Sequence, residues 1–206
     1  MSKHTMARVR TITLPHYPDY PIHIALFKNV SNAAFLRSQL LEANPDFDYA
    51  FLDATMIISF NHLLAATFLA LHNTQTSRLK ARTSHSELVF RLHSNNNIGE
   101  SYRKFGITDD TTALLAIKLG LTSEITHDSV CQHLSEYVKG EAVEIGENGD
   151  EVGSFADLAK VKKVYKLDGL GEVKGKKGAV NGDVTPVDIL KEMEGVILGT
   201  ITVKGS

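Results

Sequence analysis

The chain has 206 residues, of which 43% are hydrophobic and 22% charged, with a formal net charge of −2. This composition predicts one folded domain with a sizeable core, and the near-neutral charge excludes a polycation, so any RNA contact must come from a local basic patch. The single cysteine, Cys131, excludes an internal disulfide and a cysteine-based zinc site, which fits a reducing compartment, the cytosol or the nucleus.

The first quarter of the chain predicts a strand, a helix and a second strand. Residues 1–21 hold three of the five prolines and are expected to form an extended lead-in. Residues 22–27 suit a first strand. Apolar residues recur at helical spacing over 33–43, and Asn44-Pro45 ends that helix. A short strand is expected at 49–52.

The next segment predicts a helix with an unusually wide apolar surface. Ser59 or Asn61 opens it, and it runs to about His72, with Leu63 and Phe68 on one broad stripe and Leu69 on the opposite side. Such a helix either lies in the centre of the core or presents an apolar face to a protein partner. Polar residues interrupt the uncharged span too often for a membrane helix.

The middle of the chain predicts a strand, a capped helix and another strand. Residues 87–92 are apolar, aromatic or β-branched enough for a strand. Asn97 is a favourable N-cap for a helix that carries Ile98, Tyr102 and Phe105 on one face. Gly106 is expected in the left-handed conformation that ends many helices. A second strand is expected at 112–119.

The last part predicts mainly helices around a flexible loop. The expected elements are a helix from Thr126 or Asp128 to Gly140, a strand at 142–145, a helix at 154–167, a Gly/Lys-rich loop at 168–183, and a helix with Pro186 at its first position. The chain therefore reads as a core domain over 22–167, a flexible loop, and a C-terminal helix and tail over 184–206.

No arrangement of residues predicts catalysis, a cofactor or a metal site. Gly169-x-Gly171 lacks both the third glycine and the preceding strand of a dinucleotide fingerprint. The nine histidines show no helical ligand spacing, and no serine has the glycine-rich context of a nucleophile. We therefore expect a protein that is not an enzyme and that holds no cofactor and no metal.

Basic residues are the clearest functional signal. One group lies in the middle of the chain, at Arg78, Lys80, Arg82 and Lys104, and a second group includes Lys163 and Lys166. If the fold brings these cations together, they form a groove for phosphates; otherwise they are ordinary solvated surface. The aromatic residues Tyr102, Phe105 and Tyr165 either stack on unpaired bases or belong to the core.

Several segments, in the same order and spacing, resemble the family of the PRPK-binding protein, the small non-catalytic subunit of the KEOPS (EKC) complex. The resemblance spans roughly residues 22–167. It is carried by Ala25-Leu26-Phe27-Lys28-Asn29-Val30-Ser31-Asn32-Ala33, Arg82-Thr83, Ser86-Glu87, Ser94-Asn95-Asn96-Asn97-Ile98, Lys104-Phe105-Gly106-Ile107, Val138-Lys139-Gly140 and Lys163-Val164-Tyr165-Lys166-Leu167.

The resemblance implies an α+β domain in which helices flank a mixed, mostly antiparallel sheet. It further implies a protein that binds the atypical kinase subunit of KEOPS and recruits the single-stranded 3′ end of tRNA, while the complex makes threonylcarbamoyl-adenosine. Contact with the threonylcarbamoyl transferase subunit would be indirect, no membrane contact is expected, and the family is nuclear and cytoplasmic.

Two sets of residues follow as candidate sites. The tRNA set is Arg78, Lys80, Arg82, Lys104, Lys163 and Lys166. The kinase set is Leu63, Phe68, Leu69, Ile98 and Tyr102. The alternatives are a protein-interaction module that regulates a kinase without touching RNA, and a small-molecule-binding regulator with a closed pocket between sheet and helix.

Overall fold

The strands of the protein form one antiparallel sheet. A computed structural model describes residues 6–167, 170 and 185–204. Within these residues, the order along the main path is β1 (Val9–Leu14), β2 (Tyr17–Lys28), β4 (Leu114–Leu119) and β3 (Ala50–Asp53), while β5 (Glu141–Val143) also pairs with β2. Every pairing is antiparallel, with Ile24 of β2 opposite Ile117 of β4.

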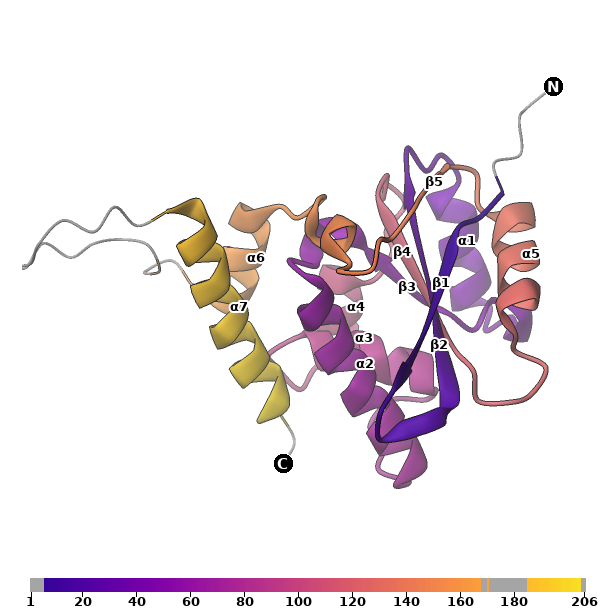
Figure 1. Ribbon diagram of the computed structural model, residues 1–206, viewed down its shortest axis with the longest axis horizontal. Helices are drawn as coiled ribbons and strands as arrows, with labels where there is room; N and C mark the ends of the chain where they lie inside the picture. Colours follow the sequence, from indigo (N-terminus) through magenta and orange to yellow (C-terminus); the bar gives the residue numbers. More distant parts are fainter. Residues whose placement is uncertain (1–5, 168–169, 171–184, 205–206) are drawn as a thin grey trace, which may run out of the picture.

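Helices cover both faces of this sheet. They are α1 (Ala33–Leu41), α2 (Phe60–Gln75), α3 (Ser84–Leu92), α4 (Ile98–Phe105), α5 (His127–Tyr137), α6 (Leu158–Tyr165) and α7 (Pro186–Thr202). Figure 1 shows α1 and α5 on one side of the sheet and the other helices on the opposite side. The expected α+β domain with a sheet flanked by helices is confirmed.

Alternation along β2 divides the interior into two cores. Successive strand residues face opposite sides of a sheet. Ile22, Ile24 and Leu26 therefore join the core beneath α2, α3 and α7, whereas Ala25 and Phe27 join the core beneath α1 and α5. All five side chains are buried, so β2 holds both helical layers together.

Local capping chemistry places most helices where the sequence predicts them. Asn97 Oδ1 accepts the Glu100 N–H at 2.9 Å and begins α4. Thr126 caps α5 in a capping box, and Pro186 is the first residue of α7. Gly106, in contrast, is extended (φ −73°, ψ 164°) and not left-handed as predicted. A Cβ there would lie 2.7 Å from the Tyr102 carbonyl oxygen, which explains the glycine.

The strand predicted at 87–92 is wrong, because these residues belong to α3. Thr83 caps this helix by accepting the Ser86 N–H at 3.1 Å. Glu87 and Arg91, four residues apart, form an ion pair at 2.8 Å inside the protein. A helix brings side chains four residues apart within contact distance, whereas in a strand the same two residues would share a face but lie about 13 Å apart. The apolar residues between them carried the misleading strand signal.

Two other segments differ from the prediction, and a third is not tested. Residues 1–21, expected as a lead-in, contain β1 and the start of β2, which pair as a hairpin. The helix expected at 154–167 is the shorter α6, preceded by a 3-10 turn at Asp150–Gly153. Most of the loop expected at 168–183 lies outside the described residues. No helix in the described ranges is both long and apolar enough to span a bilayer.

Candidate functional site

A cavity of about 720 Å³ opens beside β3, the outer strand of the main sheet path. Its walls come from the end of α1, a 3-10 turn at Pro45–Phe47, the start of α3, α4 and residues 107–110. Apolar lining comes from Leu40, Phe47 and Ile107. Segments from three separate parts of the chain therefore build one hollow.

Asp48 anchors the polar side of the cavity. Its Oδ1 accepts the Thr83 hydroxyl at 3.1 Å, and its Oδ2 lies 3.0 Å from Nδ1 of His85. Its main-chain oxygen accepts Lys118 Nζ at 2.7 Å. Burial would raise the pKa of Asp48, but His85, Lys118 and Thr83 together bring that pKa below its usual value. The cavity therefore contains a carboxylate that stays ionised at neutral pH.

His85 orients this carboxylate and has no nitrogen free for catalysis. Its Nε2 accepts the Leu119 N–H at 2.9 Å, so the neutral ring carries its proton on Nδ1, facing Asp48. Burial lowers the pKa of His85, which favours that neutral form. The neighbouring Ser86 consequently has no imidazole base, although serine, histidine and aspartate all lie close together. This arrangement suits binding and not nucleophilic chemistry.

Tyr102 supplies an aromatic wall. Its hydroxyl donates to Ser86 Oγ at 2.8 Å, which fixes the ring of α4 against the start of α3. Burial raises the pKa of Tyr102, so the hydroxyl stays protonated. A fixed ring next to hydroxyl groups and a carboxylate can stack on a planar ligand and hydrogen-bond its edge.

Three arginines line the cavity, and they differ in their partners. Arg37 pairs with Asp109 at 3.1 Å, and Arg103 pairs with Glu100. Arg82 is exposed and, within the part of the chain that the structure describes, makes no ion pair. Its guanidinium is thus the lining cation most available to an anionic ligand.

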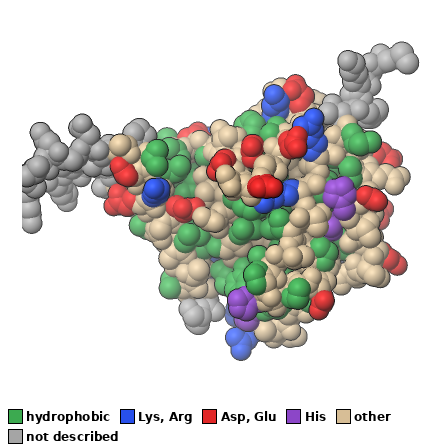
Figure 2. Space-filling model, viewed as in Figure 1, with side chains coloured by type: hydrophobic (Ala, Val, Ile, Leu, Met, Phe, Trp, Pro, Cys, Tyr) green, Lys and Arg blue, Asp and Glu red, His purple; other side chains and the backbone are tan. Residues whose placement is uncertain are grey.

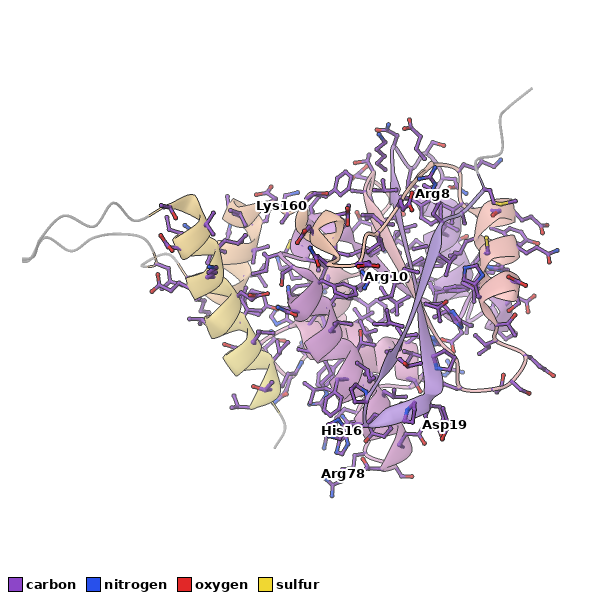
Figure 3. All side chains as sticks on the ribbon, in the orientation of Figure 1. Arg8, Arg10, His16, Asp19, Arg78 and Lys160 are labelled. Atoms are coloured by element: carbon purple, nitrogen blue, oxygen red, sulfur yellow. The ribbon has the colours of Figure 1, made fainter. Side chains whose placement is uncertain are left out.

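The other predicted cations lie outside this cavity. Arg78 and Lys80 are exposed on the connection between α2 and α3, and Lys104 is exposed on α4. Lys163 and Lys166 are exposed on and just after α6. Figure 3 shows Arg78 beyond the lower end of α2, far from Lys160 on α6. The structure does not join the α6 lysines and the α2–α3 connection into one groove.

The residues predicted for a kinase surface occupy different environments. Leu63 is fully buried, which assigns it to the core and corrects its place in the interface set. Phe68 is half-buried against the rings of His16 and Tyr17. Leu69 is half-exposed on α2, and Ile98 is exposed on α4. Tyr102, described above, lines the cavity.

Two exposed valines flank the buried stripe of α7. Met193, Ile197 and Ile201 are fully buried and pack in the core that also contains α2. Val187 is 58% and Val196 is 41% exposed, and the nine residues between them put them on opposite flanks of the helix. The side that faces away from the core carries the exposed charged residues Asp188, Lys191 and Glu192. Figures 1 and 2 show α7 at one end of the molecule, with hydrophobic side chains visible there among charged ones.

The described residues hold no cluster of three or more histidine, cysteine or acidic side chains arranged for a metal. The residues that line the cavity include three arginines, the three aspartates Asp48, Asp109 and Asp110, aromatic rings and hydroxyl groups. The sequence prediction placed Arg82 in the tRNA set and Tyr102 in the kinase set, and it missed the contribution of Asp48, which no local pattern indicates.

The known proteins compared below share one description, and each covers at least three quarters of this chain. A family model described as "Kinase binding protein CGI-121" matches residues 27–205. An "EKC/KEOPS complex subunit CGI121" of Phaeosphaeria nodorum is 53% identical, over 97% of this chain and 100% of the relative. Proteins of the same description from Aspergillus fumigatus and Schizosaccharomyces pombe are 48% and 32% identical, over 79% and 75% of this chain and 86% and 87% of the relatives.

Proposed function

Because the chain belongs to the kinase-binding CGI-121 family, we propose that it is a non-catalytic subunit of an EKC/KEOPS complex, with one surface for a kinase and another for RNA. The kinase is the atypical kinase subunit of the complex. The RNA is tRNA, held by its single-stranded 3′ end. The cavity beside β3 is the observation that supports the RNA part.

The cavity offers the contacts that an unpaired nucleotide needs. Single-stranded RNA is bound by cations along its phosphates, aromatic rings that stack on bases, and polar groups that meet base edges. Arg82 offers the cation, Tyr102 the ring, and Asp48 with Thr83 and Ser86 the polar edge. A volume of about 720 Å³ is within the range of small-ligand pockets.

The exposed cations around the cavity extend this surface. Arg78 and Lys80 precede Arg82 on the same connection, and Lys104 lies on α4 two residues after Tyr102. They are suited to phosphates that lead into the cavity and carry no base readout. Lys163 and Lys166 stay candidates for a more distant part of the same RNA.

The kinase surface in this proposal is the outer face of α7, with Val187 and Val196 at its two edges, together with Leu69 of α2. These two valines are exposed on opposite flanks of the helix, and the side between them carries exposed charged residues. Both kinds of side chain are available to a protein partner. The description of the family supports a kinase as that partner.

Reversing two charges tests the RNA assignment. The variant with Arg82→Glu and Lys104→Glu should bind a single-stranded tRNA 3′ end more weakly, and the slope of log affinity against log salt should fall by about one or more. The matched control reverses Arg8, an exposed cation far from Arg78 in Figure 3, and Lys139, an exposed cation just after α5. An unchanged salt slope in the Arg82/Lys104 variant rejects the assignment.

Binding measurements on the wild-type protein also distinguish the proposal from its alternative. If the kinase binds tightly and tRNA does not bind at all, the protein is an interaction module that regulates the kinase without RNA contact. Binding of both ligands in one ternary complex supports the proposed function. Size-exclusion chromatography of the purified components distinguishes the two results.

A further inference from the structure

A buried carboxylate holds the main chain of the cationic connection between α2 and α3. Glu87 has no exposed surface. Its Oε1 accepts Asn73 Nδ2 at 2.7 Å and Arg91 Nε at 2.8 Å. Its Oε2 accepts the N–H groups of Lys80 and Ala81, both at 2.8 Å. Glu87 therefore fixes the main-chain N–H groups of the two residues that directly precede Arg82.

These hydrogen bonds also explain how a charge is tolerated there. Burial raises the pKa of Glu87, but the donors at Ala81, Asn73, Lys80 and Arg91 outweigh it and bring that pKa below its usual value. A buried ionised group is stable only when all its partners are in place. Displacing one donor should therefore disturb the others that share the carboxylate.

Arg91 connects this carboxylate to the end of α7. Its Nη1 donates to the main-chain oxygen of Lys204, two residues beyond α7. Lys204 Nζ in turn donates to the carbonyl oxygens of Phe90 and, at 2.8 Å, His93. These carbonyls lie at the C-terminal end of α3, and burial together with the neighbouring Arg91 lowers the pKa of Lys204 to about 7. The end of α7 is thereby fastened onto α3.

A continuous series of hydrogen bonds thus joins two surfaces that are separate on the outside. It runs from Lys204 through Arg91 and Glu87 to the N–H groups of Lys80 and Ala81. One end closes the helix whose outer face is proposed to meet the kinase. The other end supports the connection that carries Arg78, Lys80 and Arg82.

We propose that Glu87 and Arg91 are positioning residues. Through them, the packing of the end of α7 against α3 determines the conformation of the Arg78–Arg82 connection, so that kinase binding and RNA binding strengthen each other. The inference rests on the proposed function for its two ligands. A partner that orders the end of α7 fixes Arg91, and Glu87 then holds the connection in one form. Linkage requires the effect to be reciprocal.

Lys204→Met tests the far end of the series. Methionine has a similar length and can cover Phe90, but it cannot donate to the end of α3. Amide hydrogen exchange at Lys80 and Ala81 should become at least about tenfold faster, and affinity for a single-stranded tRNA 3′ end should fall about fivefold. Lys191→Met, the same change at an exposed site on α7, should alter neither.

A reference amide distinguishes this effect from general loss of stability. The Ile107 N–H donates to Phe51 O at 2.9 Å in the sheet region. Faster exchange at Lys80 and Ala81, with Ile107 unchanged, supports the proposal. Equal acceleration at all three amides, or unchanged protection at Lys80 and Ala81, overturns it. Glu87→Gln, which alters the bonded carboxylate itself, should give the same local pattern.

A second test measures how kinase binding changes amide hydrogen exchange. Its binding to the wild-type protein should slow exchange at Lys80 and Ala81, and this slowing should disappear in the Lys204→Met variant. Absence of slowing in the wild type overturns the coupling. Because hydrogen exchange needs no RNA, a wild-type protein that fails to bind RNA contradicts the proposed function while the exchange result still decides whether the positioning series exists.

Discussion

His62 of α2 and Tyr165 of α6 meet inside the protein, with 2.9 Å between His62 Nε2 and the tyrosine hydroxyl oxygen. The hydroxyl donates to the carbonyl oxygen of Leu92, so it accepts a hydrogen bond from the N–H of His62 Nε2. The other ring nitrogen, Nδ1, faces the Ile58 N–H at 3.4 Å as an acceptor. A neutral imidazole therefore ties α2, α3 and α6 together.

This neutral histidine predicts acid sensitivity. Burial lowers the pKa of His62 from 6.5 to about 3. The unfolded chain binds a proton near pH 6.5 and the folded chain does not, so His62 favours folding fully above pH 6.5 and less as the pH falls toward 3. Its share of the free energy of unfolding should decrease by roughly 4 kcal/mol over that window.

Urea unfolding between pH 7 and pH 4 measures this effect. The His62→Gln variant should be less stable at pH 7, and its deficit relative to the wild type should shrink on acidification. A deficit that stays constant with pH would show that His62 does not titrate in this way. His85, which burial also holds neutral, leaves part of the slope in the variant.

Removing the Tyr165 hydroxyl should destabilise the fold without changing its shape. In Tyr165→Phe, His62 Nε2 and the Leu92 oxygen both lose their partner in a buried environment, which costs about 1–3 kcal/mol. Tyr20→Phe is the control, because the Tyr20 ring is half-exposed and packs edge-on against Tyr17. Thermal and urea unfolding should show less than about 0.5 kcal/mol for that control.

The ring of Tyr102, and not its hydroxyl, should matter for RNA. Tyr102→Ala removes the stacking surface and should weaken binding of a single-stranded 3′ end by about 1–3 kcal/mol. Tyr102→Phe keeps the ring, loses the bond to Ser86, and should bind within about threefold of the wild type. Equal losses in both variants, measured by fluorescence anisotropy, would point to the hydroxyl instead.

Charged substitutions should locate the kinase surface. Leu69→Glu and Val196→Glu place a carboxylate on the half-exposed side of α2 and on an exposed flank of α7, and each should weaken kinase binding at least about tenfold. Leu41→Glu makes the same chemical change at a side chain that is 72% exposed on α1. Calorimetric titration that finds the three variants equal would exclude the α7 face.

Residues close together in the sequence predicted several helix starts correctly. The prediction failed where the secondary structure depends on hydrogen bonds to residues far away in the chain. Asn97 and Thr126 begin helices because each bonds an N–H three residues away. Residues 87–92 look like a strand by composition, yet Glu87 needs the Lys80 and Ala81 amides, Arg91 needs the carbonyl of Lys204, and both requirements select a helix.

In the candidate site, too, the sequence indicated some residues, and only the structure showed which distant segments join them. Ser86 and Tyr102 belong to segments that the sequence singled out, and the structure joins them at 2.8 Å. Asp48 and Phe47 complete the cavity from a turn that carries no functional signal in the sequence. Leu63 and Leu69 lie on opposite sides of a helix that is apolar on most of its circumference, and only the structure shows that Leu63 is the fully buried one.

By itself, the amino-acid order determined the family, the capped helices and the absence of a recognisable catalytic motif, because these depend on residues close together in the chain. Tertiary structure alone decided which side of α2 is covered, which cations line a cavity, and which apolar residues of α7 stay exposed. The reason is that burial depends on what packs against a surface, and Met193 and Ile197 approach the central core from the far end of the chain.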